Sequence, residues 1–188
     1  MNKYSFLGLI LGFTFISSSA FAAVDPEVSY ILNTLLFLIG GFLVMWMAAG
    51  FAMLESGLVT SKSVATIAAK NIGLYSIAGL MFWFIGYNLA YGIPEGGFIG
   101  TFLPWSDASS IETGYSDGSD WFFQMVFCAT TCSIVSGTMA ERIKIWPFFL
   151  FCAILAGVIY PIEMGWQWGG GHLAAAGFSD FAGSTLVH

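Results

Sequence analysis

The stretch LLFLIGGFLVMWMAAGFAML, residues 35–54, decides the fold class of this chain. It is continuously apolar, carries no charged side chain, and matches the roughly 20 residues that a helix needs to cross the hydrocarbon core of a bilayer. Its apolar residues lack the alternation that marks a strand of a membrane barrel. Because backbone groups in lipid must pair with one another, such a run predicts a membrane-spanning helix.

The composition extends this prediction to all 188 residues. Hydrophobic residues make up 57% of the chain and charged residues only 9%, and the mean hydropathy is +0.82. A soluble domain carries about 25% charged residues, so this is the composition of an integral membrane protein. We therefore expect an all-α polytopic membrane protein.

Four apolar segments are predicted to span the membrane, at about residues 28–58, 72–92, 121–139 and 145–166. A fifth helix is predicted to begin around Phe181, close to the end of the sequence. The three cysteines, Cys128, Cys132 and Cys152, fall within the apolar segments and are interpreted as packing residues. We expect no disulfide and no metal site.

Residues 1–22 have the pattern of a cleaved secretory signal peptide. Lys3 precedes an apolar core at residues 6–16, and Ala20-Phe21-Ala22 provides a small-x-small cleavage site. The alternative is an uncleaved first transmembrane helix, which the short apolar core disfavours. Residues 23–188 then form the membrane domain, with the mature amino terminus outside.

The placement of charge predicts the orientation of the chain. Lys62 and Lys70 follow the first segment, and Arg142 and Lys144 follow the third. The loop between the second and third segments carries only acidic charges: Glu95, Asp107, Glu112, Asp117 and Asp120. By the positive-inside rule the basic loops are cytoplasmic and the acidic loop is external. We expect a protein of the inner (plasma) membrane with an external amino terminus.

Three side chains near the end of the sequence are costly to bury in lipid and mark a candidate functional site. Asp180, at the external mouth of the fifth helix, can cap exposed N–H groups or attract a cation. Trp168 can anchor the chain at the interface or bind a small cation through its ring face. His188 is expected about 12 Å deeper at the helical rise. There a neutral imidazole would line a nonpolar passage or carry a proton, the alternative being a satisfied core histidine.

The third apolar segment contributes two aromatic candidates. Phe123 and Phe127 are four residues apart, so their rings share one helical face near the outer end. Such a pair packs against neighbours or lines a narrow passage. Small residues on the same segment (Ser133, Gly137 and Ala140) favour close helix packing.

Other polar residues receive structural interpretations. Glu55 and Glu141 lie beside the basic loops, so we expect interfacial pairing with Lys62, Arg142 or Lys144. His172 follows three glycines and is interpreted as an interfacial residue. Glu163 has no assigned role.

Five blocks of sequence occur in a distinctive order: AGFAMLESGLVTSK (49–62), FWFIGYNLAYG (82–92), FQMVFCATTCSIVSGTMAERIK (123–144), WGGGHL (168–173) and DFAGSTLVH (180–188). The last block is the most specific of the five, because it follows Trp168 at a fixed separation in the sequence. In these blocks the sequence resembles the ammonium transporter (Amt/Mep/Rh) family. Ser63 departs from the Asn that many members have after the lysine.

The resemblance implies the first half of an eleven-helix fold with two inverted five-helix halves: helices one to four and the start of the fifth. It implies a homotrimer when full length, with one pore in each subunit and no cofactor. The implied substrate is ammonium or ammonia, with methylammonium as an analogue. The lipid bilayer and a cytoplasmic PII-type regulator are the further partners that it implies.

The resemblance also assigns roles to individual residues. Trp168 and Phe127 resemble the family's external ammonium recruitment site, with Phe123 as a neighbouring aromatic and Asp180 as a supporting carboxylate. Phe127 also resembles one of two gate phenylalanines. His188 resembles the first of twin pore histidines.

The sequence carries no nucleophile constellation, metal motif or nucleic-acid patch, so we do not expect an enzyme or a nucleic-acid-binding protein. Two functional hypotheses stay open: transport of ammonium, and ammonium sensing by the membrane module of a signalling protein. Residues 1–188 alone are not expected to support methylammonium uptake, because the resemblance places half of the pore wall downstream.

Overall fold

The computed structural model describes residues 24–188, and four helical spans account for most of them. Each is long and apolar enough to cross a membrane: Pro26–Leu58, Ser61–Tyr91, Asp117–Met139 and Ile145–Ala175. These spans confirm the four predicted segments and the all-α membrane fold. The second begins earlier than predicted, at Ser61, because Lys70 lies inside it with its charge paired. The predicted signal peptide lies outside the described residues.

The spans are built from shorter elements. The α-helices are α2 (Pro26–Leu58), α3 (Val64–Met81), α4 (Tyr87–Tyr91), α5 (Asp117–Met139), α6 (Ile145–Ile154), α7 (Tyr160–Gln167) and α8 (His172–Ala175). Two 3₁₀ turns are η1 (Ser61–Ser63) and η3 (Ile111–Thr113). Two π-helical segments are η2 (Phe82–Gly86) and η4 (Leu155–Ile159).

The start of α2 is encoded locally. Asp25 Oδ1 accepts a hydrogen bond from the N–H of Glu27 at 2.9 Å, and Pro26 at the first helical position has no N–H to leave unpaired. The carboxylate of Glu27 in the first turn also favours the positive end of the helix dipole. Of its residues only Gly41 and Glu55 are buried, so α2 lies along the outside of the bundle.

The π-helical segments interrupt two spans that the sequence predicts as regular helices. In the fourth span Pro161 has no N–H, so the regular pairing of the Gly157 carbonyl fails. The two segments also approach each other closely, since a Cβ on Gly86 would lie 3.1 Å from the carbonyl oxygen of Ala156. This contact fixes the second span against the fourth.

A pair of glycines brings α5 against α2. A Cβ on Gly41 would lie 2.6 Å from Cε1 of Phe122, and one on Gly40 would lie 2.9 Å from Cε2 of Phe123. A Cβ at either position would force the phenylalanine rings to shift, so the two glycines allow these rings to pack closely on the α2 backbone. The contact sets the position of Phe123 at the outer part of α5.

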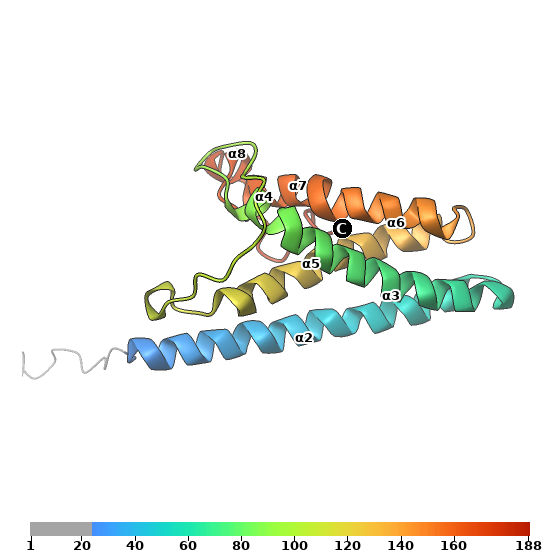
Figure 1. The fold of residues 1–188 in the computed structure, drawn as a ribbon, viewed down its shortest axis with the longest axis horizontal. Helices are drawn as coiled ribbons and strands as arrows, with labels where there is room; N and C mark the ends of the chain where they lie inside the picture. The colour runs from blue at the N-terminus through green and yellow to red at the C-terminus, as the bar shows by residue number, and fades with distance from the viewer. Residues whose placement is uncertain (1–23) are drawn as a thin grey trace, which may run out of the picture.

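The connections gather at the two ends of the bundle (Figure 1). Residues 59–63 and 140–144 lie at one end, on the right of the picture. The long connection 92–116 lies at the other end with the start of α2. It is fastened to α2 by hydrogen bonds from Asn33 Nδ2 to the Gly114 carbonyl (3.0 Å) and from the Ser116 N–H to Thr34 Oγ1 (2.9 Å). The basic and acidic loops therefore lie at opposite ends, as expected, while the orientation in the membrane stays a prediction.

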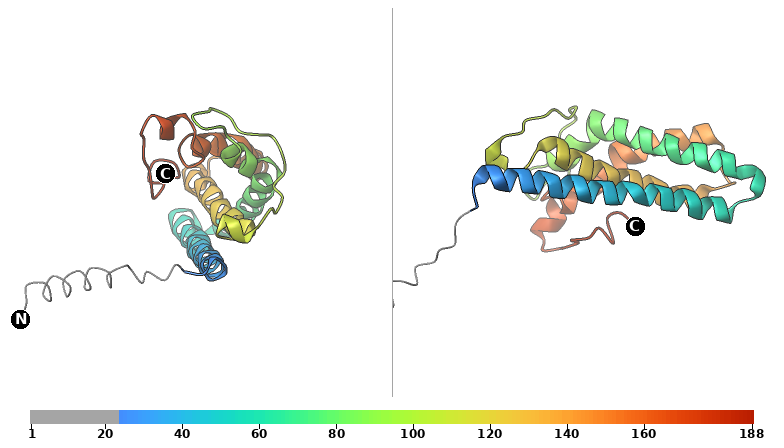
Figure 2. Two further views of the ribbon diagram at one scale, coloured as in Figure 1. Left: turned by 90° about the vertical axis from the view of Figure 1, so that its left-hand side faces the viewer. Right: turned by 90° about the horizontal axis from the view of Figure 1, so that it is seen from below.

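The residues after α8 run back beside the bundle (Figure 2). The fifth helix is predicted to start around Phe181, but residues 181–183 are not helical and the first turn lies slightly later, at 184–187. In that turn the Val187 N–H donates to the Gly183 carbonyl at 2.9 Å. The helical rise does not apply between Asp180 and His188, so the expected 12 Å depth, which assumed it, does not hold.

Glu55 corrects a second prediction. It is only 2% exposed and pairs with Lys70, 4% exposed, at 2.9 Å, and not with a residue of the interfacial loops. Ser136 Oγ donates to both Glu55 oxygens at 2.9 Å, and Lys70 Nζ donates to the Ser136 carbonyl at 2.8 Å. A buried charge needs such partners, which come here from α2, α3 and α5. The network ties these three helices together.

Candidate functional site: an aromatic pocket

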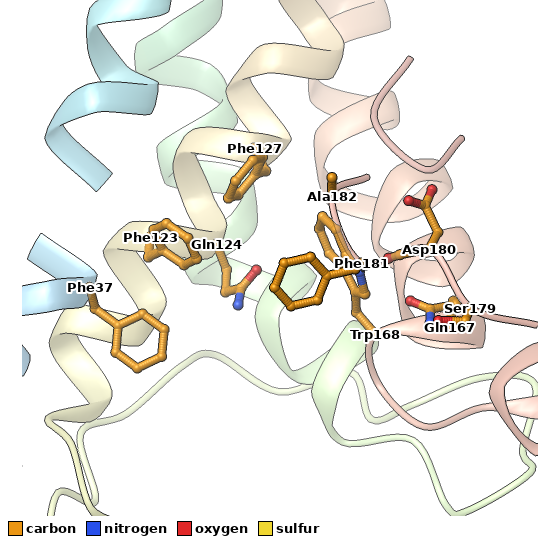
Figure 3. Close-up of a pocket in the computed structure, with 10 residues that line it drawn as sticks. All are labelled: Phe37, Phe123, Gln124, Phe127, Gln167, Trp168, Ser179, Asp180, Phe181 and Ala182. Atoms are coloured by element: carbon orange, nitrogen blue, oxygen red, sulfur yellow. Dashed lines mark hydrogen bonds between the residues drawn. The ribbon is translucent and has the colours of Figure 1, made fainter. Parts of the chain in front are cut away.

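An aromatic pocket of about 590 Å³ opens between the outer part of α5, the end of α7 and the segment after α8 (Figure 3). Aromatic rings, two amides, a hydroxyl and a carboxyl residue line it: Phe37, Phe123, Gln124, Phe127, Gln167, Trp168, Ser179, Asp180, Phe181 and Ala182. The structure thus brings together all four residues that the sequence predicts for the recruitment site. It lies towards the end of the bundle that carries the acidic loop.

The rings form a connected series along the pocket. Phe127 meets Trp168 with ring centroids 5.6 Å apart at 69°, and Phe123 meets Phe127 at 5.1 Å and 90°. Phe37 of α2 continues the series at 5.3 Å from Phe123. These contacts confirm that Phe123 and Phe127 share one face of α5. Edge-to-face packing leaves ring faces, which are electron-rich, available to a small cation.

A single hydrogen bond fixes the plane of the Trp168 indole. Its Nε1–H donates to the main-chain carbonyl of Asp180 at 2.7 Å, which links the end of α7 to the segment after α8. Gly183 lies against the same ring in the left-handed region, at φ 77°. A Cβ at Gly183 would approach Trp168 Cη2 to 2.8 Å. The indole is therefore held by one polar contact and one close backbone contact.

The carboxylate of Asp180 caps the turn that leads to His188. Oδ2 accepts from the N–H of Thr185 (2.7 Å) and Leu186 (3.1 Å), and Oδ1 accepts from Gly183 (2.8 Å) and Ser184 (3.1 Å). These bonds, that of Thr185 above all, lower the pKa of Asp180 from its ordinary value. The predicted capping role is confirmed. The carboxylate points towards this turn and away from Phe123 (Figure 3).

A second pocket, of about 320 Å³, lies next to the first. Phe127 and Ala182 belong to both pockets, so they form part of the wall between them. Its other lining residues are Leu43, Val44, Met47, Thr130, Val187 and His188. His188 is exposed there, with Nδ1 3.4 Å from the Gly183 carbonyl, so residues 24–188 do not provide the burial that was expected of it.

Two further predicted residues lie elsewhere. Glu141, at a positive φ of 61°, accepts hydrogen bonds from the hydroxyl (2.6 Å) and N–H (3.0 Å) of Thr60. The Thr60 hydroxyl is the main cause of its lowered pKa. The predicted interfacial ion pair is thus replaced by a loop-to-loop hydrogen bond. His172 begins α8 and stacks on Phe98 with centroids 4.3 Å apart.

The cysteines and Glu163 add nothing to the pocket. Cys128, Cys132 and Cys152 are free and buried, and Cys128 Sγ donates to the Ala156 carbonyl at 3.4 Å. Within residues 24–188 no group of three or more His, Cys, Asp or Glu residues is placed to hold a metal ion. Glu163 is half-buried on α7, and the described residues give it no role.

Several lining residues were not predicted from the sequence. Phe37 reaches the pocket from α2, and Ser179 and Phe181 reach it because the chain folds back after α8. No local pattern signals such contacts. Gln124 could have been found, because it lies between Phe123 and Phe127 and is the polar residue of their helical face.

Most of the chain is similar to proteins of one known family. Residues 35–188 match the Ammonium Transporter Family. The ammonium transporter Amt2 of Archaeoglobus fulgidus is 42% identical over 166 residues, which are 80% of this chain and 34% of that protein. The ammonium transporter of Aquifex aeolicus is 33% identical over 195 residues, covering 100% of this chain and 45% of that protein.

A solved structure supports the fold. The structure titled "Sensor Amt Protein" superposes with a TM-score of 0.79 at 31% identity, over 87% of this chain and 42% of that one. This chain therefore spans less than half the length of the relatives that it matches. Members of the matched family are transport proteins and not enzymes. By the match over residues 35–188 and by its fold, the chain belongs to the ammonium transporter family.

Proposed function

We propose that this chain forms the ammonium-recruiting mouth and the first part of the pore of an ammonium transporter. One observation carries the proposal: Trp168 and Phe127 meet edge to face in an open pocket, and a second pocket behind Phe127 reaches His188. Transport itself is proposed for the whole protein, since the chain spans less than half of its relatives.

The energies of cation binding and desolvation determine what can pass. A cation on an aromatic face gains about 0.5–1 kcal/mol at an exposed site and about 2 kcal/mol when desolvated. Moving a bare unit charge into a low-dielectric interior costs on the order of 20 kcal/mol by the idealised Born estimate. The rings can hold ammonium at the mouth but cannot carry it through an apolar passage. We infer that the ion releases a proton, either to water at the open mouth or to the imidazole of His188, and that neutral ammonia moves past Phe127.

Beyond Phe127 the second pocket offers groups for a neutral base. Its lining is apolar except for Thr130 and His188. A neutral imidazole can hydrogen-bond ammonia, or it can move the released proton. Recording current together with uptake distinguishes transport of NH₃ from net transport of NH₄⁺.

Assembly and orientation are part of the same proposal. The mouth faces outward, and the end with residues 59–63 and 140–144 faces the cytoplasm, where a PII-type regulator would bind. The full-length protein forms a homotrimer. Large apolar side chains exposed along α2, such as Leu36, Trp46 and Met53, offer a surface for lipid or a neighbouring subunit.

Replacing Trp168 tests recruitment. Residues 35–188 are placed in the A. fulgidus Amt2 in exchange for its matching part, and methylammonium uptake is measured in cells without ammonium uptake of their own. Trp168→Leu removes the ring face and should raise the half-saturating concentration about 5- to 30-fold, whereas Trp168→Phe should retain part of the affinity. Equal affinity in all three chimeras would exclude Trp168 from recruitment.

A second candidate function is ammonium sensing, favoured by the likeness to the structure titled "Sensor Amt Protein". The same mouth would then bind the ion without passing ammonia. Uptake by the intact protein decides between the two: a sensor binds ammonium but transports none.

A further inference from the structure

A buried carboxylate lies one helical turn from the aromatic pocket. Asp120, near the start of α5, is 7% exposed and accepts two hydrogen bonds. The hydroxyl of Tyr87 on α4 donates to Oδ2 at 2.7 Å, and Nε2 of Gln124 donates to Oδ1 at 3.2 Å. The first bond joins α4 to α5, and the second fixes the Gln124 amide against the carboxylate.

This network decides which atom of the Gln124 amide faces the pocket. An ionised carboxylate only accepts hydrogen bonds, so its partner must be the amide N–H and not the amide oxygen. The amide oxygen, Oε1, is then turned away from Asp120. Figure 3 shows it between Phe123 and Phe181, directed into the pocket. Tyr87 occupies the other carboxylate oxygen and so keeps Asp120 from rotating.

We propose that Gln124 is a further recognition residue of the ammonium site and that Asp120 positions it. The inference rests on the proposed function and deepens it. The aromatic faces attract any small cation but accept only weak N–H···π hydrogen bonds. The Gln124 oxygen adds one acceptor for an N–H of ammonium, and Asp120 acts only through that oxygen's orientation.

The acceptor gives the site a preference that rings alone do not have. Ammonium has four N–H donors on a compact ion, whereas methylammonium replaces one of them with a methyl group. Loss of the oxygen therefore weakens ammonium binding more than methylammonium binding, since the methyl group still contacts the rings. The ratio of the affinity for ammonium to that for methylammonium should therefore fall when Gln124 is replaced by a residue without an amide oxygen.

The test is the half-saturating concentration of uptake by the intact protein, with ammonium and with methylammonium. Gln124→Leu should raise it about tenfold for ammonium, less for methylammonium, with the maximal rate per protein in the membrane unchanged. Asp120→Leu should act alike, and Asp120→Asn, which keeps an acceptor for Nε2, should stay close to wild type. The double variant Asp120→Leu/Gln124→Leu should be no worse than either single variant.

Three other results would each overturn part of the proposal. If Trp168→Leu changes the affinity but Gln124→Leu does not, the recognition role is overturned while the proposed function stands. If the effects of Asp120→Leu and Gln124→Leu add, or if Asp120→Leu lowers only the maximal rate, Asp120 is a structural residue and not a positioning one. If the wild type takes up no ammonium, the proposed function fails and this inference with it.

Discussion

The carboxylate of Asp180 forms its hydrogen bonds with the backbone of the residues that follow it. Its two oxygens accept four N–H groups from residues 183–186, which would otherwise be unpaired at the start of the turn before His188. Its main-chain carbonyl holds the Trp168 indole. One residue thus sets the position of both the histidine and the Trp168 ring, which we propose binds the cation. This geometry is consistent with the proposed role of Asp180, in which its carboxylate supports the site without touching the ion.

The lowered pKa of Asp180 gives a pH prediction. A carboxyl group whose folded pKa is lowered stabilises the fold at every pH above its unfolded pKa, about 3.9, and loses this effect as pH falls through the folded value. Affinity for methylammonium should therefore not change through Asp180 between pH 5 and 7. Asp180→Asn, whose side chain has one acceptor oxygen, should lower affinity and uptake at all of these pH values. An Asn variant that differs from wild type only at pH 5 would contradict this role.

At the scale of single residues, the sequence indicated residues that the structure brings together in one pocket, but it did not indicate their partners. Trp168, Asp180 and the pair Phe123–Phe127 stand out because such groups are rare in lipid-compatible sequence or share a helical face. Glu55 was misplaced because its partner Lys70 is on another helix, and one-dimensional charge patterns favour the nearest basic residues. Phe37 gave no signal at all.

Gly183 determines the backbone path of the segment after α8. Its positive φ and its contact with Trp168 both exclude a side chain. Gly183→Ala should push the indole away and weaken the cap by Asp180. We expect a loss of methylammonium affinity comparable to that of Trp168→Leu. Gly114→Ala, at a positive φ but with no atom near its Cβ, is the matched control and should leave affinity unchanged.

The buried pair between α2 and α3 gives a stability prediction. Glu55→Gln leaves Lys70 buried without its counter-ion and should destabilise the fold by about 3–5 kcal/mol. The double variant Glu55→Gln/Lys70→Met removes both charges and should recover most of this loss. Melting of the detergent-purified variants measures both effects. A double variant less stable than Glu55→Gln would show that Lys70 contributes more than a counter-charge.

The membrane-spanning helices were predicted from the sequence, but the π-helical segments within them were not. Long apolar runs give membrane helices directly, because length and hydropathy alone determine them. The π-helical segments depend on Pro161 and on packing between two spans, which no periodicity reports. The start of the fifth helix shifted because the carboxylate of Asp180 requires non-helical residues before the turn that it caps.

For the whole molecule, the orientation in the membrane is the prediction to test. Ser109 belongs to the acidic connection 92–116 and Ser61 to residues 59–63. These two segments lie at opposite ends of the bundle (Figure 1). Applied to whole cells, a membrane-impermeant maleimide should label Ser109→Cys and spare Ser61→Cys. The native cysteines are buried, which keeps the background low. The reverse pattern would place the aromatic pocket inside the cell and contradict uptake from outside.

The central claim is that ammonium binds at the aromatic mouth and passes Phe127 towards His188. The most direct test is methylammonium uptake by the Amt2 chimera that carries residues 35–188, compared with its His188→Ala variant at matched membrane abundance. We predict uptake by the chimera, and at least about a tenfold lower maximal rate with little change in half-saturation after His188→Ala, because the histidine acts after recruitment. Unchanged uptake in the variant would contradict the account.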